Sequence, residues 1–327
     1  MKSKWSIVKR QLVQREEIGV VVTLLAVMSL FGILDPAFLG KVNLMRLLRQ
    51  ACILSIMAIG IDFVISSNGM DVSVGAILAV CATIVAQMLV DGCSMFLSIL
   101  AAVLAGALLG LINGLIVTKL RIRELIATLG TSYLIRGLLL QISGAKWLTN
   151  LPRAFKQIGQ GSWLGVPVPV YILVGVIVAT IFFSNYTPLG KQLRAIGGNL
   201  DAAKLTGVKT DRVKVISFTL CGLLTGVAGV VYASRMGSVQ SNAGNGMEFE
   251  VISAALIGGA SFDGSGSPFG AFLGAMLLTA ISNGMVLLGI SSYLEDVIIG
   301  ALIIVALIVN LMRNRYEIAL EVRNSEE

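Results

Sequence analysis

The sequence predicts an all-α membrane protein with about ten transmembrane helices. Three observations support this: of 327 residues, 56% are hydrophobic and only 13% are charged, and the mean hydropathy is +0.89. Soluble globular domains contain about 45–50% apolar and about 25% charged residues. Because one span needs about 20 residues, the chain has room for about ten spans and their loops. This composition argues against a water-soluble enzyme and excludes a disordered or collagen-like chain.

Apolar runs mark the expected helices in chain order. The first, 18–34, follows a basic segment, 1–17, and superficially looks like a secretory signal. No small-residue cleavage site follows it and many apolar runs come after it, so we expect it to stay attached as a first span. The other spans are expected at about 51–66, 73–90, 96–118, 123–142, 168–184, 214–234, 250–262, 268–289 and 292–312.

The distribution of basic residues predicts the orientation. Lys and Arg gather in cytoplasmic loops of membrane proteins, and most of the 25 lie in 1–17, in 119–123, in or next to 185–213 and in 313–327. If loops alternate, these segments share one side. We therefore expect both terminal segments, 1–17 and 313–327, to be cytoplasmic. The same distribution explains the net charge of +7 without nucleic acid, for which the sequence has no binding motif.

The sequence offers little that could support catalysis. It has no histidine, the commonest general base, and its four cysteines stand singly, without the usual zinc-ligand spacing. A phosphate-binding loop is also missing, because Gly190 and Lys191 are followed by Gln192 and lack the upstream glycine. We expect no enzymatic activity, no metal and no cofactor in this chain. If ATP drives it, another polypeptide must bind the nucleotide.

Two glycine-rich polar stretches predict helices that break inside the membrane: SSNGMDVSVG at 66–75 and SFDGSGSPFG at 261–270. Irregular backbone at that depth requires cover by protein or a water-filled cavity, and paired interruptions point to transporters built from internal repeats. The alternative is an ordinary cytoplasmic turn in which Asp71 caps the next helix. The candidate residues for a broken helix or translocation path are Asn68, Asp71, Ser73, Gly75, Asp263, Gly264 and Gly266.

Asp62 and Arg136 are expected within spans, where ionisable side chains are costly and usually functional. Two such groups on different spans could form a proton relay or a buried ion pair, as a secondary carrier needs. The alternative is a structural role for each, facing a wet cavity or a helix interface. Asp62 joins the candidates for the translocation path.

The segment 185–213 is too long for a simple turn and too basic to enter lipid. Its middle, NLDAAKLTG, predicts a short helix: Asn199 can cap it, Asp201 complements the positive end of its dipole, and Gly207 can end it. We expect an element that docks another protein; the alternative is a helical loop without a partner. The candidate coupling residues are Gly197, Gly198, Asn199, Asp201, Ala202, Ala203, Leu205 and Gly207.

The order acidic-Ala-Ala-three residues-Gly in Asp201–Gly207 resembles the loop of ABC importer permeases that docks into the ATP-binding subunit. Further stretches are similar to the ribose-type monosaccharide permeases: NGMDVSVG, IATLGTSYLIRG, TPLGKQLRAIGGN, DAAKLTGVKTDRVK and AGNGMEFEVISAALIGGASFDGSGSPFGAFLGA. The outer loop GAKWLTNLPRAFKQI resembles that of autoinducer-2 and rhamnose permeases. The chain departs from the family at Asp62, where the family often has Thr, and at Arg123-Glu124, where a Pro-containing turn is usual.

This resemblance implies a type II ABC importer-like fold in which 1–327 form one permease domain with two pseudo-symmetric halves. It implies a multi-pass protein of the bacterial inner membrane that pairs with a second permease subunit, identical or a sister chain. ATP and Mg would be bound by separate ATPase subunits docked on 185–213, and a periplasmic or lipid-tethered binding protein would deliver a monosaccharide-like solute. A secondary ion-coupled solute carrier is the alternative.

Overall fold

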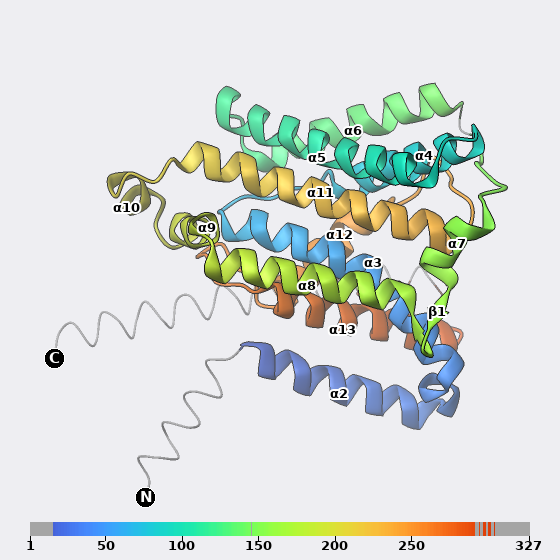
Figure 1. Ribbon diagram of the computed structural model, residues 1–327. Coiled ribbons are helices and arrows are strands. Elements are labelled where there is room, and N and C mark those ends of the chain that lie inside the picture. The colour runs from blue at the N-terminus through green and yellow to red at the C-terminus, as the bar shows by residue number, and fades with distance from the viewer. Residues whose placement is uncertain are drawn as a thin grey trace, which may run out of the picture.

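A computed structural model shows a bundle of long helices whose axes lie roughly along one common line (Figure 1). It describes residues 16–144 and 146–291 and six single positions between 294 and 304. The predicted terminal segments 1–17 and 313–327 therefore lie outside the described residues, apart from Glu16 and Glu17, which begin the first helix. Most of the predicted span at 292–312 also lies outside them.

The described chain is almost entirely helical. Its only strands form a small antiparallel hairpin, in which Ser162 pairs with Pro167 and Trp163 with Val166. The elements in order are α2 (Glu16–Leu34), η1 (Pro36–Leu39), α3 (Lys41–Ser66), α4 (Val74–Val90), α5 (Met95–Leu120), α6 (Glu124–Ser143), α7 (Arg153–Gln160), β1 (Ser162–Trp163), β2 (Val166–Pro167), α8 (Val168–Tyr186), α9 (Pro188–Gly198), α10 (Leu200–Leu205), α11 (Thr210–Met236), α12 (Met247–Ile257) and α13 (Pro268–Leu287).

Seven described helices are long and apolar enough to cross a membrane: α2, α3, α5, α6, α8, α11 and α13. The predicted spans near 73–90 and 250–262 are shorter elements, since α4 has 17 residues and α12 has 11. At about 1.5 Å per residue, α12 spans about 17 Å and cannot cross the hydrocarbon alone. The all-α membrane fold is confirmed, and these short helices adjoin the predicted interruptions.

The boundary predicted at residue 51 is wrong, because α3 begins at Lys41. Lys41, Arg46 and Arg49 occupy its first turns, and these basic residues end the apolar run on which the prediction rested. Long basic side chains at the end of a span can reach water while their stems stay in apolar surroundings. The helix therefore includes a polar first part, before residue 51, that a hydropathy pattern predicts as a loop.

Glycines allow α5 and α11 to approach closely at the centre of the bundle. A Cβ atom at Gly106, Gly110 or Gly114 of α5 would overlap the backbone of α11, and one at Gly222 would overlap α5 in return. Small residues spaced four apart let membrane helices pack through their backbones, where dispersion and weak polar contacts replace the hydrophobic effect. This interface fixes α11 beside the helices that hold the first interruption.

The bundle has a buried centre and an apolar periphery. In the most apolar 18-residue window of α3, 83% of residues are buried, against 6% for α2 and 17% for α8. The large exposed side chains of these outer helices are apolar or aromatic, as expected for a surface that faces lipid. The two ends differ: α9 and α10 lie at one end, and α7 and the hairpin lie at the other (Figure 1).

Candidate functional site

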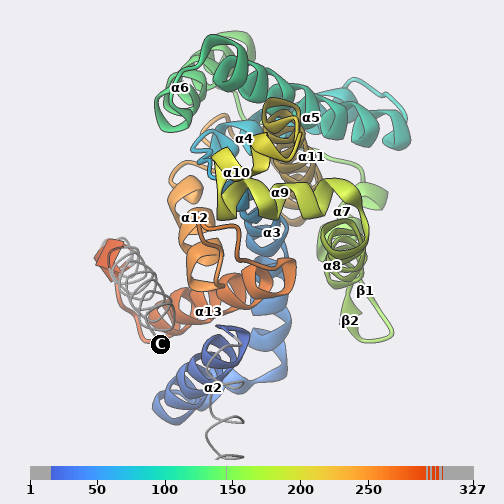
Figure 2. The same cartoon turned by 90° about the vertical axis from the view of Figure 1, so that its left-hand side faces the viewer.

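The predicted docking helix is present at one end of the bundle, where α10 faces the viewer in Figure 2. The Asn199 side chain accepts a hydrogen bond from the Ala202 N–H at 2.9 Å, which caps the helix start as predicted. Gly207 follows the helix with φ +83°, a backbone conformation that favours glycine. The local sequence therefore determines both ends of this short helix.

Only part of α10 is available to a partner. Leu205 is 90% exposed, and Ala202 and Asp201 are also exposed, whereas Ala203 is buried against the rest of the chain. The Lys204 ammonium lies 3.4 Å from the Asp201 carboxylate on this outer side. An apolar leucine held out at the end of a polar segment is the feature that a partner protein would cover.

Gly197 and Gly198 belong to the last turn of α9, which begins at Pro188 after a Thr187 cap. Gly197 packs directly on the second interruption: an added Cβ would overlap the Gly264 backbone and the carbonyl oxygen of Ser66, the last residue of α3. A Cβ at Gly198 would meet only the Asp263 carbonyl oxygen, at 3.5 Å. The end of α9 thus touches both interruptions through backbone contacts.

The second interruption, residues 258–267, is a tight turn with hydrogen bonds inside it and one to α2, which the Ser267 hydroxyl donates to Glu17 Oε1 at 2.7 Å. The Ser261 N–H donates to the Ser265 carbonyl at 2.9 Å, and Asp263 Oδ1 accepts from the Ser265 N–H at 2.8 Å. Gly264 and Gly266 have φ values of +84° and +145°. A Cβ at Gly266 would overlap Asp62 Oδ1, so the predicted path residue Asp62 faces this turn from α3, where it is 3% exposed.

The first interruption, residues 67–73, is held by side chains from the surrounding helices. The Val72 N–H donates to Thr128 Oγ1 of α6 at 3.2 Å, and Asn113 of α5 donates to Ser73 Oγ at 2.7 Å. Ser67 Oγ lies 3.0 Å from Ser217 Oγ of α11. Most of this loop is buried within the bundle, so it is not a solvent-exposed turn.

Asp71 occupies the centre of this loop and is fully buried. Its Oδ1 accepts from the Ser73 N–H at 2.8 Å and from the Ser73 hydroxyl at 2.6 Å. Ser73 is the residue before α4, so Asp71 fixes the entry into the helix by binding its N-cap residue. Asp71 Oδ2 has no hydrogen-bond partner among the described residues. Asn68, in the turn that follows α3, has a left-handed backbone conformation with φ +56°.

Arg136 pairs with Glu248, an acid that was not among the residues predicted from the sequence. Its Nη2 lies 3.7 Å from Glu248 Oε2 of α12 and donates to the Gly244 carbonyl at 3.0 Å. A Cβ at Gly75, in the first turn of α4, would overlap Glu248 and the Gly244 carbonyl. Arg136 therefore pairs with Glu248, a partner that was not predicted; both side chains are partly buried, and Gly75 is required for close packing against them.

A second ion pair lies nearer the docking end. Lys214 Nζ of α11 lies 2.6 Å from Glu124 Oε1 of α6 and 3.3 Å from the Asn68 carbonyl oxygen. Glu124 occupies the position where the resemblance leads us to expect a proline-containing turn. This departure from the family pattern supplies the acid that binds Lys214, and the ion pair connects α6 and α11 next to the first interruption.

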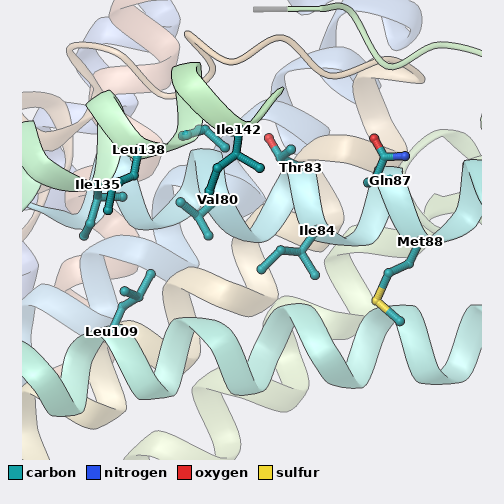
Figure 3. A pocket seen from close by; sticks show the side chains of 10 residues that line it. Val80, Thr83, Ile84, Gln87, Met88, Leu109, Ile135, Leu138 and Ile142 are labelled. Atoms are coloured by element: carbon teal, nitrogen blue, oxygen red, sulfur yellow. The ribbon is translucent and has the colours of Figure 1, made fainter. Parts of the chain in front are cut away.

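A crevice between α4, α5 and α6 encloses about 430 Å³ and is almost entirely apolar (Figure 3). Figure 3 shows Val80, Ile84 and Met88 of α4 facing it, together with Ile135 and Leu138 of α6. Its polar members are Thr83 and Gln87. Such a surface cannot satisfy the hydroxyl groups of a polar solute, so this crevice is not the translocation path.

Apolar helices around two helix breaks, with a short polar helix at one end, are typical of a membrane permease. The chain belongs to the family described as the permease component of the branched-chain amino acid transport system, which matches residues 43–307. This membership confirms the sequence-based identification as a permease of the ABC importer type, and not an enzyme.

Curated relatives are similar over most of the chain. A ribose import permease protein of Bacillus subtilis (strain 168) is 40% identical over 90% of this chain and 92% of its own length. An autoinducer 2 import system permease protein of Photorhabdus laumondii subsp. laumondii is 34% identical over 89% and 88%. A ribose import permease protein of Escherichia coli (strain K12) is 34% identical over 88% and 92%. No solved structure matches the chain.

Proposed function

We propose that this chain is the membrane-spanning subunit of an ATP-driven importer for a monosaccharide or sugar-like solute. The relatives named for import of ribose and autoinducer 2 support the substrate class. The observation that carries the mechanism is the packing of Gly197 against Gly264 and Ser66, because it joins the docking segment to both helix breaks.

The partners follow from this proposal. Separate ATP-binding subunits hold ATP and Mg and dock on the segment 185–213, with Asn199, Asp201, Ala202 and Leu205 of α10 as the contact region. A second permease subunit, identical or a sister chain, completes the path, and a periplasmic or lipid-tethered binding protein delivers the solute. The protein lies in the bacterial inner membrane with both termini cytoplasmic, which places α9 and α10 inside and α7 outside.

The proposed mechanism is alternating access without chemistry on the solute. ATP binding draws the partner subunits together and moves α10 with them. Because α9 contacts Gly264, that motion reaches the second interruption and the adjacent Asp62. The helices on either side of the break then change their packing, and the path, for which Asp62, Ser73 and Gly266 are candidates, opens first outward and then inward.

Reconstitution tests this proposal. The permease is inserted into proteoliposomes with and without the ATP-binding subunits that co-purify with it from its own cells, and uptake of labelled ribose and autoinducer 2 is followed with purified binding protein present. We expect accumulation only with the ATP-binding subunits and ATP. Accumulation under an ion gradient, without any ATP-binding subunit, would instead establish the secondary carrier.

A pair of leucine variants tests the docking role. Leu205→Glu changes the exposed residue of α10, and Leu164→Glu changes a leucine that is 82% exposed in the hairpin turn at the other end of the bundle. We expect the first to uncouple ATP hydrolysis from uptake and the second to leave coupling intact. Equal coupling in both variants, at equal membrane insertion, would remove α10 from the docking interface.

A further inference from the structure

A cavity of about 600 Å³ lies at the end of the bundle that carries α10, on the left in Figure 1. Four helices border it: α5 with its last residues, α6 and α11 with their first turns, and α10. Its ionisable lining residues are Arg121, Arg123, Lys204, Lys214, Glu124 and Asp211. Unlike the apolar crevice in Figure 3, this cavity can therefore hold a charged group.

The two arginines of this cavity differ from its two lysines. Nitrogen–oxygen distances of 2.6 Å and 3.4 Å join the lysines to the acids Glu124 and Asp201. Within the part of the chain that the structure describes, Arg121, Arg123 and Asp211 form no ion pair, and all three are exposed. Two arginines against one acid leave the lining with one uncompensated positive charge, which is accessible to a ligand.

The arginines lie at the boundary of the membrane. Residues 121–123 connect α5 to α6, and both helices are long and apolar enough to cross a membrane. Large apolar side chains beside the arginines are exposed: Leu120, Ile122, Leu125 and Ile126. Cations next to exposed apolar side chains are typical of the level at which phospholipid headgroups meet the hydrocarbon.

From these observations we infer that the cavity binds the phosphate of an anionic phospholipid, whose acyl chains lie on the exposed apolar side chains of α5 and α6. Arginine binds phosphate through paired N–H donors, and basic pockets between membrane helices hold anionic headgroups. The uncompensated positive charge matches the negative charge of phosphatidylglycerol. An acidic protein segment would match the cations but would leave the neighbouring apolar side chains without a partner. The inference depends on the membrane fold and not on the direction of transport.

Lipid titration tests the site on the full-length permease. The protein is purified in detergent and titrated with phosphatidylglycerol or with phosphatidylcholine of the same acyl chains, and bound lipid is measured by native mass spectrometry. We expect phosphatidylglycerol to bind more tightly than phosphatidylcholine. Each basic residue near an anionic lipid changes binding about fivefold, so Arg121→Gln combined with Arg123→Gln should weaken phosphatidylglycerol binding about 25-fold.

Further variants separate a binding site from a general effect of charge. Arg121→Lys combined with Arg123→Lys keeps both charges and should retain most of the binding. Lys191→Gln combined with Arg212→Gln removes the same charge from exposed cations of α9 and α11 that do not line the cavity, and should leave binding unchanged. Arg123→Gln alone leaves the left-handed residue Arg121 in place and should weaken binding about fivefold.

Equal binding of the two lipids, or an equal loss in the two double glutamine variants, would overturn the inference. Displacement of phosphatidylglycerol by inorganic phosphate at the same concentration would also overturn it, because the site would then take a free anion. A third contrary result is normal phosphatidylglycerol binding by Arg121→Gln, Arg123→Gln together with weaker binding of the ATP-binding subunits in nanodiscs of phosphatidylcholine alone, which would make this a protein-docking surface. Uptake without ATP-binding subunits would overturn the proposed function and leave the lipid site standing.

Discussion

The two helix interruptions differ in what holds them. The first, 67–73, is buried and is bonded by Asn113, Thr128 and Ser217 on three different helices. The second, 258–267, has hydrogen bonds inside its own turn and one from Ser267 to Glu17 of α2, and it lies against the backbone of α9. The two breaks look alike in sequence, but they lie in different structural surroundings. We interpret the first as a fixed support and the second as the part that α9 moves.

The largest expected effect comes from the contact between α9 and the second interruption. Gly197→Val places a branched side chain where even a Cβ overlaps the Gly264 backbone. We expect ATP-driven uptake to fall at least tenfold, corresponding to ~1.4 kcal/mol or more, while the protein still inserts in the membrane. Uptake and ATP hydrolysis are measured on the same proteoliposomes.

The adjacent glycine provides the control for that variant. Gly198→Ala introduces a Cβ that meets only one carbonyl oxygen, at 3.5 Å, which is an ordinary contact distance. We expect uptake close to that of the unchanged protein. Gly197→Ala, whose Cβ already overlaps the Gly264 backbone, is the matched variant and should lose uptake; an equal loss in Gly198→Ala would show that the contact with Gly264 does not matter.

A large effect on stability is expected at the ion pair beside the first interruption. Arg136→Met leaves Glu248 partly buried without its cation, at a cost between those of surface and buried ion pairs, about 1–3 kcal/mol. We expect a clearly lower unfolding temperature in detergent. The double variant Arg136→Met, Glu248→Met removes both charges and should recover most of the loss. If it is as unstable as the single variant, the two charges are not coupled.

A smaller effect separates the two acids of the interruptions. Asp71→Ala removes the acceptor of two hydrogen bonds from Ser73 in a fully buried position, at a cost of about 1–3 kcal/mol. Asp263→Ala changes a partly buried turn residue, for which we expect less. Unfolding temperatures in detergent compare the two variants, and a larger loss for Asp263→Ala would reverse our assignment of the fixed support.

The smallest effect is expected at the helix cap of α10. Asn199→Ala removes the hydrogen bond to the Ala202 N–H and destabilises the helix by about 1 kcal/mol. Coupling, measured as solute imported per ATP hydrolysed, should fall modestly, and Asn199→Asp should preserve it because aspartate caps equally well. A deficit in both variants would point to a role of the amide other than capping.

Local patterns were enough to predict much of the fold. Apolar runs located the long helices, and Asn199 and Gly207 bounded α10 because capping depends on neighbouring residues only. The spacing of Gly106, Gly110 and Gly114 also carried a packing signal that the sequence reading did not use. The start of α3 was not predicted, because basic side chains at the end of a helix lower the local hydropathy as a loop does.

The contacts between distant residues that define the site could not be predicted from the sequence. Gly197 and Gly264 meet only through the packing of α9 on the second interruption, and no local pattern joins residues so far apart in the chain. Glu248 was missed because it stands in a polar stretch before the predicted span at 250–262. Its pairing with Arg136 becomes visible only when α12, which contains Glu248, folds into the bundle with α6.

The most direct test measures whether the second interruption moves relative to the first. Spin labels at Asn68→Cys and Ser265→Cys, in a Cys93→Ala background, report the distance between the two breaks in the assembled transporter. We predict that a non-hydrolysable ATP analogue changes this distance, and that Gly197→Val abolishes the change. An unchanged distance in a transporter that remains active would contradict the transmission of motion through α9.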